Sequence, residues 1–543
     1  MGTFKFKNWK AIACCVAGLL GARLDGNEWT NPYELDQGDA AFGNYTTPSV
    51  EIAVNSSGQA AAAWKEFFAA GQANVKAAYF DGFVWSSAVD VSPPIAPASA
   101  NRLSVSINES GIASVTWQDS VAQEMFLSIY SNGSWSAPIQ VSTTTVNLGN
   151  APVTNGIDAD GNILVVWVNG PSPTETIFAR QFNSSGIALS GEVALSSPAE
   201  ETVGQTAFKV FQFSMNNNGE AMYVWGGGAA VGSTVMKYAY FDGTTWTITN
   251  QTFYATPGNY QSISVDLNDS GLAAATWVDA TVVPGSFLNA VSFYDGSAWS
   301  APIYLDSSTI GMTLTQIGID ADGNCLAVWQ NQTVVGPPPQ YDLKSQYYSK
   351  RTNTWKTPTL HASPAFDAVL EMNTRGNALL SWSAGFATPD ITTDVGILQA
   401  SLFQNKQWLA PATISSTAGK ARASGLSYSD GGIGAIGWRF GVDAMTPVLI
   451  QTAFFSNALY GKQVANTFPS QIDYVNTLEW PKIWSPASFL YYSITRNGVP
   501  IAQVPSSSAP YFEDHHQTKG AAYTYTITGI TSGGPSVTYT VSF

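Results

Sequence analysis

The chain has 543 residues, which exceeds the usual size of one domain and leaves ample sequence for a large core. Hydrophobic residues make up 45% of it and charged residues only 11%, far below the roughly 25% that is typical of globular proteins. The net charge of −15 argues against a nucleic acid or an anionic membrane surface as partner, because like charges repel.

The N-terminus has the pattern of an export signal. Lys5, Lys7 and Lys10 form a basic segment that is followed by the apolar run AIACCVAGLLGA at residues 11–22. We therefore predict a signal peptide at 1–22; a buried first strand is the alternative. An apolar run of this length is too short to span a bilayer, so the mature chain is expected to have no transmembrane span. We expect it to be secreted, or to reside at the cell surface or in the periplasm.

The next segment, WTNPYEL at 29–35, copies WSAPIYL at 299–305, which is the fourth strand of a repeat that begins further along the chain. The last repeat lacks this pattern where its fourth strand would begin, at Tyr460. We therefore predict that residues 29–35 complete the last repeat and hide the edges that the two chain ends would otherwise leave unpaired.

A glycine followed six positions later by tryptophan recurs eight times, at intervals of 50 to 58 residues. The pairs are Gly58/Trp64, Gly111/Trp117, Gly161/Trp167, Gly219/Trp225, Gly271/Trp277, Gly323/Trp329, Gly376/Trp382 and Gly432/Trp438. An alternating segment precedes each Asx-x-x-Gly turn, and a run of small and apolar residues leads to the tryptophan. A Tyr- and Phe-rich segment and a last strand, which in six repeats opens with tryptophan, follow.

Four antiparallel strands in each unit of about 50 residues are typical of a β-propeller blade. The sequence therefore predicts an all-β protein with an eight-bladed propeller over residues 23–467; seven blades would result if one repeat were displaced. The repeats resemble those of bacterial-type extracellular propellers and, distantly, of sialidases, whose Asp-box reads S-x-D-x-G-x-x-W. The Gly-to-Trp spacing here is six instead of three, which is a departure from that motif.

After Phe468 the repeat stops. The tail contains a tryptophan at 480, the hairpin sequence YSITRNG at 492–498 and the strand YTYTI at 523–527. These features resemble a fibronectin type III domain, which implies a β-sandwich at 468–543 that serves as a spacer or adhesion module.

Two sets of residues are candidates for a ligand site. The first is a ring at the loop-side ends of the second strands, two residues after the repeat tryptophan, and is formed by Glu66, Asp119, Asn169, Asp279 and Asn331. A local role for these side chains, as caps that bond their own loops, is the competing interpretation. The second set, implied by the sialidase resemblance, consists of Arg102, Arg422 and Arg439, which would surround a substrate carboxylate.

Metal and histidine chemistry have little support. Asp158-Ala-Asp-Gly and Asp320-Ala-Asp-Gly look like calcium loops, but the other repeats carry turns such as NSSG and NNNG at this place. We read them as ordinary Asx turns and predict no metal and no cofactor. His361 is the only histidine of the predicted propeller, which argues against a Ser-His-Asp triad there.

Together these patterns favour an exported, monomeric, non-catalytic binding or adhesion protein whose variable loops bind a glycan or protein ligand. A sialidase-like glycan hydrolase and a structural surface protein without a discrete ligand are the alternatives.

Overall fold

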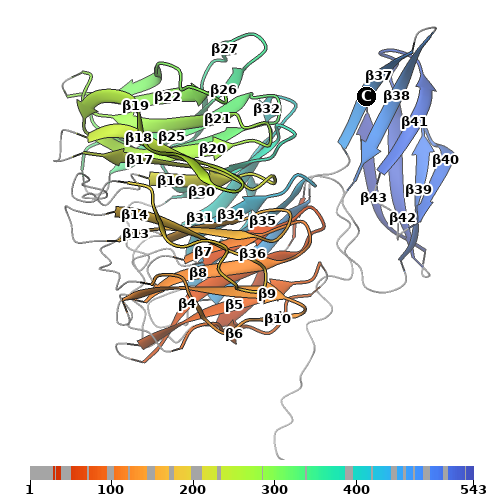
Figure 1. Ribbon diagram of the computed structural model, residues 1–543. Coiled ribbons are helices and arrows are strands. Elements are labelled where there is room, and N and C mark those ends of the chain that lie inside the picture. The colour runs from red at the N-terminus through yellow and green to blue at the C-terminus, as the bar shows by residue number, and fades with distance from the viewer. Residues whose placement is uncertain are drawn as a thin grey trace, which may run out of the picture. The chain divides into compact units, whose positions relative to one another are not determined.

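The computed structural model shows an all-β chain of two compact units, one comprising Asn31–Asn457 and the other Met1–Thr30 together with Ala458–Phe543 (Figure 1). The structure describes residues 28–30, 32–37, 50–69, 72–82, 84–93, 103–119, 123–143, 153–169, 176–196, 211–228, 234–283, 285–336, 339–385, 396–417, 420–441, 449–456, 460–468, 471–480, 489–505, 511–531 and 534–542. Within these ranges there is no helix, and hence none that could cross a membrane. The predicted signal peptide lies outside them.

The first unit contains eight antiparallel sheets among its described residues, which we number in chain order. Sheet 1 comprises β3 (Val50–Val54), β4 (Ala60–Ala69), β5 (Gln72–Phe80) and β6 (Val89–Asp90), and sheet 2 comprises β7 (Leu103–Ile107), β8 (Ala113–Asp119), β9 (Glu124–Ser131), β10 (Ser134–Trp135) and β11 (Ile139–Gln140). Sheet 3 comprises β12 (Val153–Ile157), β13 (Ile163–Asn169), β14 (Thr176–Phe182) and β15 (Val193–Ala194). Sheet 4 comprises β16 (Phe211–Met215), β17 (Glu220–Gly227), β18 (Thr234–Asp242) and β19 (Trp246–Gly258).

Sheets 5 to 8 follow the same order. Sheet 5 comprises β20 (Tyr260–Leu267), β21 (Ala273–Asp279), β22 (Phe287–Tyr294) and β23 (Ile303–Ser308), and sheet 6 comprises β24 (Met312–Ile319), β25 (Cys325–Val334), β26 (Gln340–Ser349), β27 (Thr354–Trp355) and β28 (Thr359–Ala362). Sheet 7 comprises β29 (Ala365–Met372), β30 (Ala378–Ala384), β31 (Ile397–Gln404), β32 (Gln407–Trp408) and β33 (Ala412–Thr413). Sheet 8 comprises β34 (Lys420–Tyr428), β35 (Ile433–Gly441) and β36 (Leu449–Ser456).

The first strands of these sheets form a closed ring. Each contacts the first strand of the next sheet, and β34 of sheet 8 contacts β3 of sheet 1. Sheet 8 receives its outer strand from the N-terminal side, because β2 (Tyr33–Gln37), which follows β1 (Glu28–Trp29), pairs with β36. This radial arrangement of four-stranded sheets is the β-propeller fold.

The repeat pattern explains the local structure. The glycine of every first turn has a positive φ, between 72° and 84°, which L side chains rarely adopt. The second strand that follows carries the repeat tryptophan, and all eight tryptophans are at most 1% exposed. They fill the space between neighbouring sheets and are the largest buried side chains of the unit.

The first strand of a sheet is an edge strand, and some of its backbone N–H groups are hydrogen-bonded by side chains of the preceding sheet. At five junctions a side chain on one first strand accepts a hydrogen bond from a backbone N–H of the next first strand. Examples are Ser427 Oγ from Val54 N (3.0 Å), Asp266 Oδ2 from Ile319 N (2.9 Å) and Gln316 Oε1 from Leu370 N (2.7 Å). Ser104 and Ser214 accept in the same way from Asn155 and Leu267. Edge donors that would template aggregation are thereby capped.

A second ladder runs through the first turns. The amide Nδ2 of Asn55, Asn108, Asn216, Asn268 or Asn373 donates to the backbone carbonyl of the equivalent residue in the next sheet, at 2.8–3.1 Å. Asp158 and Asp320 have no amide to donate, and at their junctions the backbone N–H of Ala159 and Ala321 donates to the next turn instead. The short turns therefore form one continuous bonded rim.

The second unit is a pair of sheets. One has the order β37 (Tyr460–Phe468), β38 (Gln471–Glu479), β41 (Tyr511–Gln517), and the other the order β40 (Val499–Pro505), β39 (Phe489–Arg496), β42 (Thr524–Thr531), β43 (Gly534–Ser542). Trp480, Tyr492, Ile494 and Tyr525 are buried in its core. The segment from Tyr460, where a fourth strand of the last repeat would begin, instead forms β37, which pairs along its length with β38.

Candidate functional site

The five polar residues of the predicted ring lie at or near the ends of β4, β8, β13, β21 and β25, two residues after each tryptophan. Asp119, Asp279 and Asn331 are buried, whereas Glu66 and Asn169 are half-buried. Their bonding partners differ from sheet to sheet and define three local environments.

Glu66 belongs to a cluster at the junction of sheets 8 and 1. Its carboxylate forms a 2.7 Å salt bridge with Lys76 of β5. Lys76 also reaches Asp36 Oδ2 of β2 at 3.3 Å, and Trp64 Nε1 donates to the same oxygen at 3.0 Å. Burial opposes the charge on Lys76, but the Glu66 and Asp36 carboxylates outweigh it and raise the Lys76 pKa. Asp36 thus links the N-terminal strand of sheet 8 to two strands of sheet 1.

Asn331 belongs to an equivalent cluster at the junction of sheets 5 and 6. Trp329 Nε1, Asn331 Nδ2 and Lys344 Nζ all contact Asp306 Oδ2, at 2.9, 2.7 and 3.1 Å. Burial alone would raise the pKa of Asp306, but the bonds from Trp329 and Lys344 outweigh it and lower that pKa. Asp306 stands seven residues after Trp299, as Asp36 stands seven after Trp29, so the two clusters are copies of one inter-sheet contact.

Asp279 has a third environment, made mainly of tyrosines. Its Oδ1 accepts from Thr281 N at 2.9 Å, and the Tyr304 hydroxyl lies 3.5 Å from its Oδ2. The Tyr304 hydroxyl is also 3.2 Å from that of Tyr254, which lies on β19 of sheet 4. Asp279 itself is fully buried, whereas Tyr304 is 39% exposed. We call Tyr254, Tyr260, Asp279 and Tyr304 the tyrosine cluster.

The structure brings two of the three predicted arginines together. Arg422 of β34 and Arg439 of β35 are paired across the strands, and Arg439 is only 2% exposed. Arg102 lies outside the described residues. Sequence reasoning missed Lys65, which is 5% exposed and whose pKa is lowered to about 8 by burial and then by Arg439. Lys65 and Arg439 each follow a repeat tryptophan directly, and that shared position could have revealed the pair.

Acidic side chains on the first strands were also missed. Glu371 of sheet 7 stands two residues before its Asx turn, as Asp266 does in sheet 5. Burial, followed by the charges of Asp266 and Glu51, raises the pKa of Glu371 to about 8. Asp266 is engaged structurally, since it accepts from Ile319 N and from Ser214 Oγ.

His361 of β28 has a structural environment. Its Nε2 is 2.8 Å from Ser345 Oγ, which also accepts from Trp408 Nε1 at 2.9 Å, and its ring meets Trp408 edge-on at 4.6 Å. Burial lowers the pKa of His361 to about 4, so it is neutral at physiological pH.

The two DADG turns are Asx turns by their bonding. Asp158 accepts from the backbone N and side-chain Nδ2 of Asn162 at 2.7 and 2.9 Å, and Asp320 from those of Asn324, both at 2.8 Å. Both oxygens of each carboxylate are therefore used. We expect that adding a chelator such as EDTA leaves the thermal melting curve unchanged. An increase in melting temperature when calcium is then added would contradict this interpretation.

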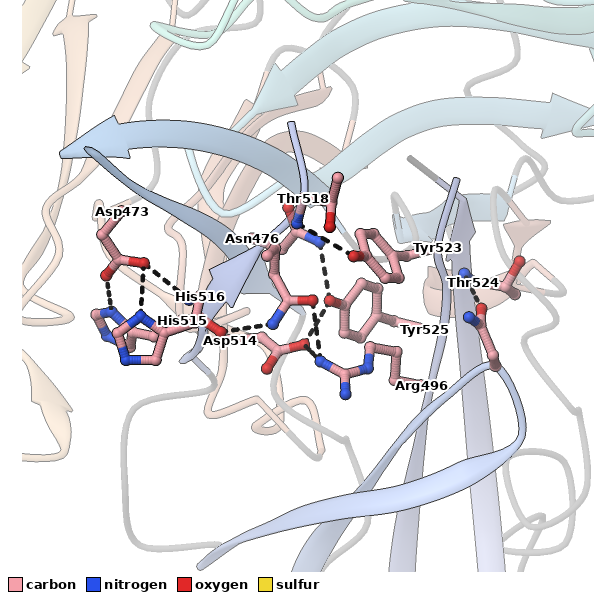
Figure 2. Close-up of polar contacts among 12 residues, drawn as sticks. Asp473, Asn476, Arg496, Asp514, His515, His516, Thr518, Tyr523, Thr524 and Tyr525 are labelled. Carbon is pink, nitrogen blue, oxygen red and sulfur yellow. Dashed lines mark hydrogen bonds and ion pairs between the residues drawn. The ribbon is translucent and has the colours of Figure 1, made fainter. Parts of the chain in front are cut away.

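The second unit carries a partly buried polar network between its two sheets (Figure 2). Asp514 Oδ2 accepts from Arg496 Nη1 at 2.7 Å and from the Tyr525 hydroxyl at 2.6 Å, and Asn476 Nδ2 donates to that hydroxyl at 2.9 Å. Such a network fixes the pairing of the sheets and offers little capacity for a ligand.

Beside this network, His515 is held between two carboxylates. Its Nδ1 is 2.8 Å from Asp473 Oδ2 (Figure 2). Its Nε2 is 3.2 Å from Glu513 Oε2. His516 adds a backbone N–H at 2.8 Å from Asp473 Oδ1. Within the described ranges, no group of three or more acidic, histidine or cysteine side chains has metal-binding geometry.

These contacts predict a pH dependence for the second unit. The hydrogen bond and charge of Asp473, and then Glu513, raise the His515 pKa, and the histidines lower the pKa of Asp473. Because the His515 pKa is raised in the folded state, protonated His515 stabilises the fold fully below about pH 6.5, and this stabilisation is lost as the pH rises through the folded pKa. Because the Asp473 pKa is lowered, ionised Asp473 stabilises the fold above about pH 4, and this stabilisation is lost as the pH falls further. We expect the protection of amides in β38 and β41, measured relative to the intrinsic exchange rate at each pH, to fall as the pH rises above about 6.5. The His515→Gln variant should lose this dependence, and identical pH profiles in both proteins would contradict the assignment.

No protein-family model matches the chain, and no curated protein sequence matches it. Among solved structures it is similar to a polysaccharide lyase of family PL25, an ulvan lyase (12% identity, 68% of this chain and 88% of that chain, TM-score 0.33). It is also similar to the arabinofuranosidase Arb93A of Fusarium graminearum (10%, 66% and 93%, TM-score 0.37) and to AofleA of Arthrobotrys oligospora (12%, 61% and 90%, TM-score 0.33). At these scores the names of those proteins assign nothing to this chain.

Proposed function

We propose that the chain is an exported, non-catalytic binding protein in which an eight-bladed propeller presents a glycan or protein ligand site and a fibronectin type III-like domain follows as a spacer. The observation that carries this proposal is the asymmetry of the propeller. Its short first turns are tied into one bonded rim, and the second-to-third-strand connections, which vary in length and sequence, leave from the opposite ends of the second strands. Variable loops on a rigid scaffold are the usual place for recognition.

The eight sheets and their ring of first-strand contacts support the blade count. The strand orders β37-β38-β41 and β40-β39-β42-β43 support a fibronectin type III-like sandwich. Tyr523 adds to this, because its hydroxyl accepts from Thr518 N at 3.2 Å, in the manner of a tyrosine corner. Export by a signal peptide at 1–22, with a secreted, cell-surface or periplasmic destination, belongs to the same proposal.

A glycan hydrolase of the sialidase type is the second candidate, and the cross-strand pair Arg422–Arg439 is the observation in its favour. Against it, Glu66 and Asn331 bond to side chains of their own or the neighbouring sheet. The Glu66 carboxylate, paired with Lys76, is a poor general acid or base, and the amide of Asn331 cannot act as one. The ring and arginine sites stay predictions.

The test uses residues 23–543 on an array of neutral and acidic glycans, on a panel of immobilised extracellular proteins, and with fluorogenic glycosides. We expect saturable binding to at least one panel and no turnover of any glycoside. Turnover would favour the hydrolase. Absence of binding on both panels would favour a structural surface protein and overturn the proposal.

A further inference from the structure

The tyrosine cluster at the junction of sheets 4 and 5 differs from the equivalent places in the other sheets. At Glu66 and Asn331 the polar group after the tryptophan has a short, strong partner, at 2.7 Å in both cases. Among the described residues, Asp279 Oδ2 has one hydrogen-bond contact, the Tyr304 hydroxyl at 3.5 Å. That distance is beyond the usual O–H···O range, so Asp279 engages the Tyr304 hydroxyl only weakly, and this hydroxyl retains capacity for a better partner.

The hydroxyls that surround Asp279 are close to solvent. Tyr304 is 39% exposed, and its hydroxyl lies 3.2 Å from that of the half-buried Tyr254. Val282 and Val283, which follow Asp279 in the second-to-third-strand connection, are 44% and 46% exposed. The site therefore combines exposed apolar surface, two hydroxyls and one buried carboxylate oxygen at the loop side of the propeller.

The side chains of the tyrosine cluster are held in place by contacts within the protein. Tyr254 packs against the rings of Trp277 and Tyr260 at 5.7 and 5.8 Å, and the Tyr260 hydroxyl donates to the Thr256 carbonyl. Thr281 binds Asp279 Oδ1 through its N–H and accepts from Asn259 N at 2.6 Å through its Oγ1. The aromatic rings and the carboxylate are thus held from both sheets, which lowers the entropic cost of binding.

The charge of the site selects among ligands. Asp279 is an acceptor in a chain of net charge −15, so it repels carboxylated or sulfated groups. Burial, and then the Tyr254 hydroxyl, raise the pKa of Tyr304 above its usual value, so its phenol remains a hydrogen-bond donor at physiological pH. An uncharged ligand with several hydroxyls and an apolar face matches these groups.

We propose that the tyrosine cluster is a binding subsite for a neutral sugar residue, whose hydroxyls bond to the Tyr254 and Tyr304 hydroxyls while its C–H face packs on the exposed Tyr304 ring. Asp279 is fully buried and contacts the Tyr304 hydroxyl from the protein side. This inference rests on the proposed binding function and deepens it by naming the ligand class and the sheets that bind it.

The test measures binding of the chain, residues 23–543, to an array of neutral, amino and acidic glycans, followed by titration of the best neutral glycan. Tyr304→Ala should raise the Kd of the chain for this neutral glycan about tenfold or more, which is the effect expected from the loss of one hydrogen bond and its ring contact. Tyr304→Phe should retain part of the affinity, because the ring remains and only the hydroxyl is lost. Tyr511→Ala is the matched control, since Tyr511 is also 39% exposed but belongs to the second unit.

The outcomes separate the two proposals. Neutral-glycan binding that is unchanged in both Tyr304 variants would overturn the subsite and leave the binding function standing. Binding only of acidic glycans or only of proteins would do the same. If the wild-type chain binds nothing on either panel, both proposals fail. Should Tyr304→Ala unfold, Tyr254→Phe and Tyr304→Phe, which keep the packed rings, provide the measurement.

Discussion

We expect that deleting residues 29–37 lowers the melting temperature of the propeller unit by several degrees or causes the chain to aggregate. The deletion removes β2, which pairs with β36, and exposes the outer edge of that strand. It also removes Asp36, so Trp64 Nε1 and Lys76 lose an acceptor at the junction with sheet 1. A buried donor left without a partner costs about 1–3 kcal/mol, which applies to Trp64 Nε1, whereas Lys76 keeps its salt bridge with Glu66. The loss of strand pairing adds to this cost.

The control for this experiment is a pair of point variants, Asp36→Asn and Asp306→Asn. Both aspartates accept from a repeat tryptophan and from a lysine at different junctions, so both variants should be destabilised, and by less than the deletion. The measurement is thermal melting together with light scattering. A deletion variant that melts and scatters like the wild-type chain would show that the ring closes without β2.

Replacing Trp167 with alanine should destabilise the propeller by about 3–5 kcal/mol, the usual cost of deleting a buried large aromatic side chain. Trp167 is 1% exposed and stacks with Phe178 at 5.9 Å in a core shared by sheets 2 and 3. The cavity would face two sheets at once, so neither sheet alone can close it.

Phenylalanine variants separate packing from hydrogen bonding. In the described residues Trp167 Nε1 has no acceptor, whereas Trp329 Nε1 donates to Asp306. Trp329→Phe should therefore cost more than Trp167→Phe, by about 1 kcal/mol for the lost bond. Urea unfolding monitored by fluorescence measures both. A loss below about 1 kcal/mol for Trp167→Ala would mean that the repeat tryptophans do not hold the sheets together.

Much of the propeller unit follows from spacing in the sequence, because its determinants are local. The Asx-x-x-Gly turn fixes where each first strand ends, and the tryptophan six residues later fixes which residues of the second strand are buried. Four of the last strands open with the sequence pattern W-x-x-P. In three of them the proline, Pro138, Pro358 or Pro411, lies between two short strands: β10 and β11, β27 and β28, or β32 and β33. A proline cannot donate to the ladder, so pairing is interrupted there.

The contacts of the candidate sites were not predictable in this way. Glu66 and Asn331 were identified as polar residues at strand ends, but the aspartate at each of those junctions, Asp36 or Asp306, stands 25 or more residues earlier and on the preceding sheet. Tyr254 and Tyr304 meet between two outer strands that are 50 residues apart. Such pairs depend on how sheets stack, and the local pattern carries no information about it.

The strand from Tyr460 shows the same limit. Its sequence, without the tryptophan and proline of the other outer strands, gave no positive evidence for sheet 8, and it forms a hairpin with β38. Hairpin pairing with the next segment competes with distant pairing in every chain, and the short connection favours it.

The backbone bonds between first strands run in one direction around the axis at the five junctions where the described residues form them: a side chain of one sheet accepts, and a backbone N–H of the following sheet donates. Sheets 5 and 6 each take part on both sides, since each accepts from the next sheet and donates to the preceding one. A duplicated copy of sheet 5 or sheet 6, inserted at the junction between them, would therefore find a partner for these bonds on both sides. At that junction the packing of the side chains that fill the gap, and not the hydrogen bonding of the first strands, would limit the number of sheets.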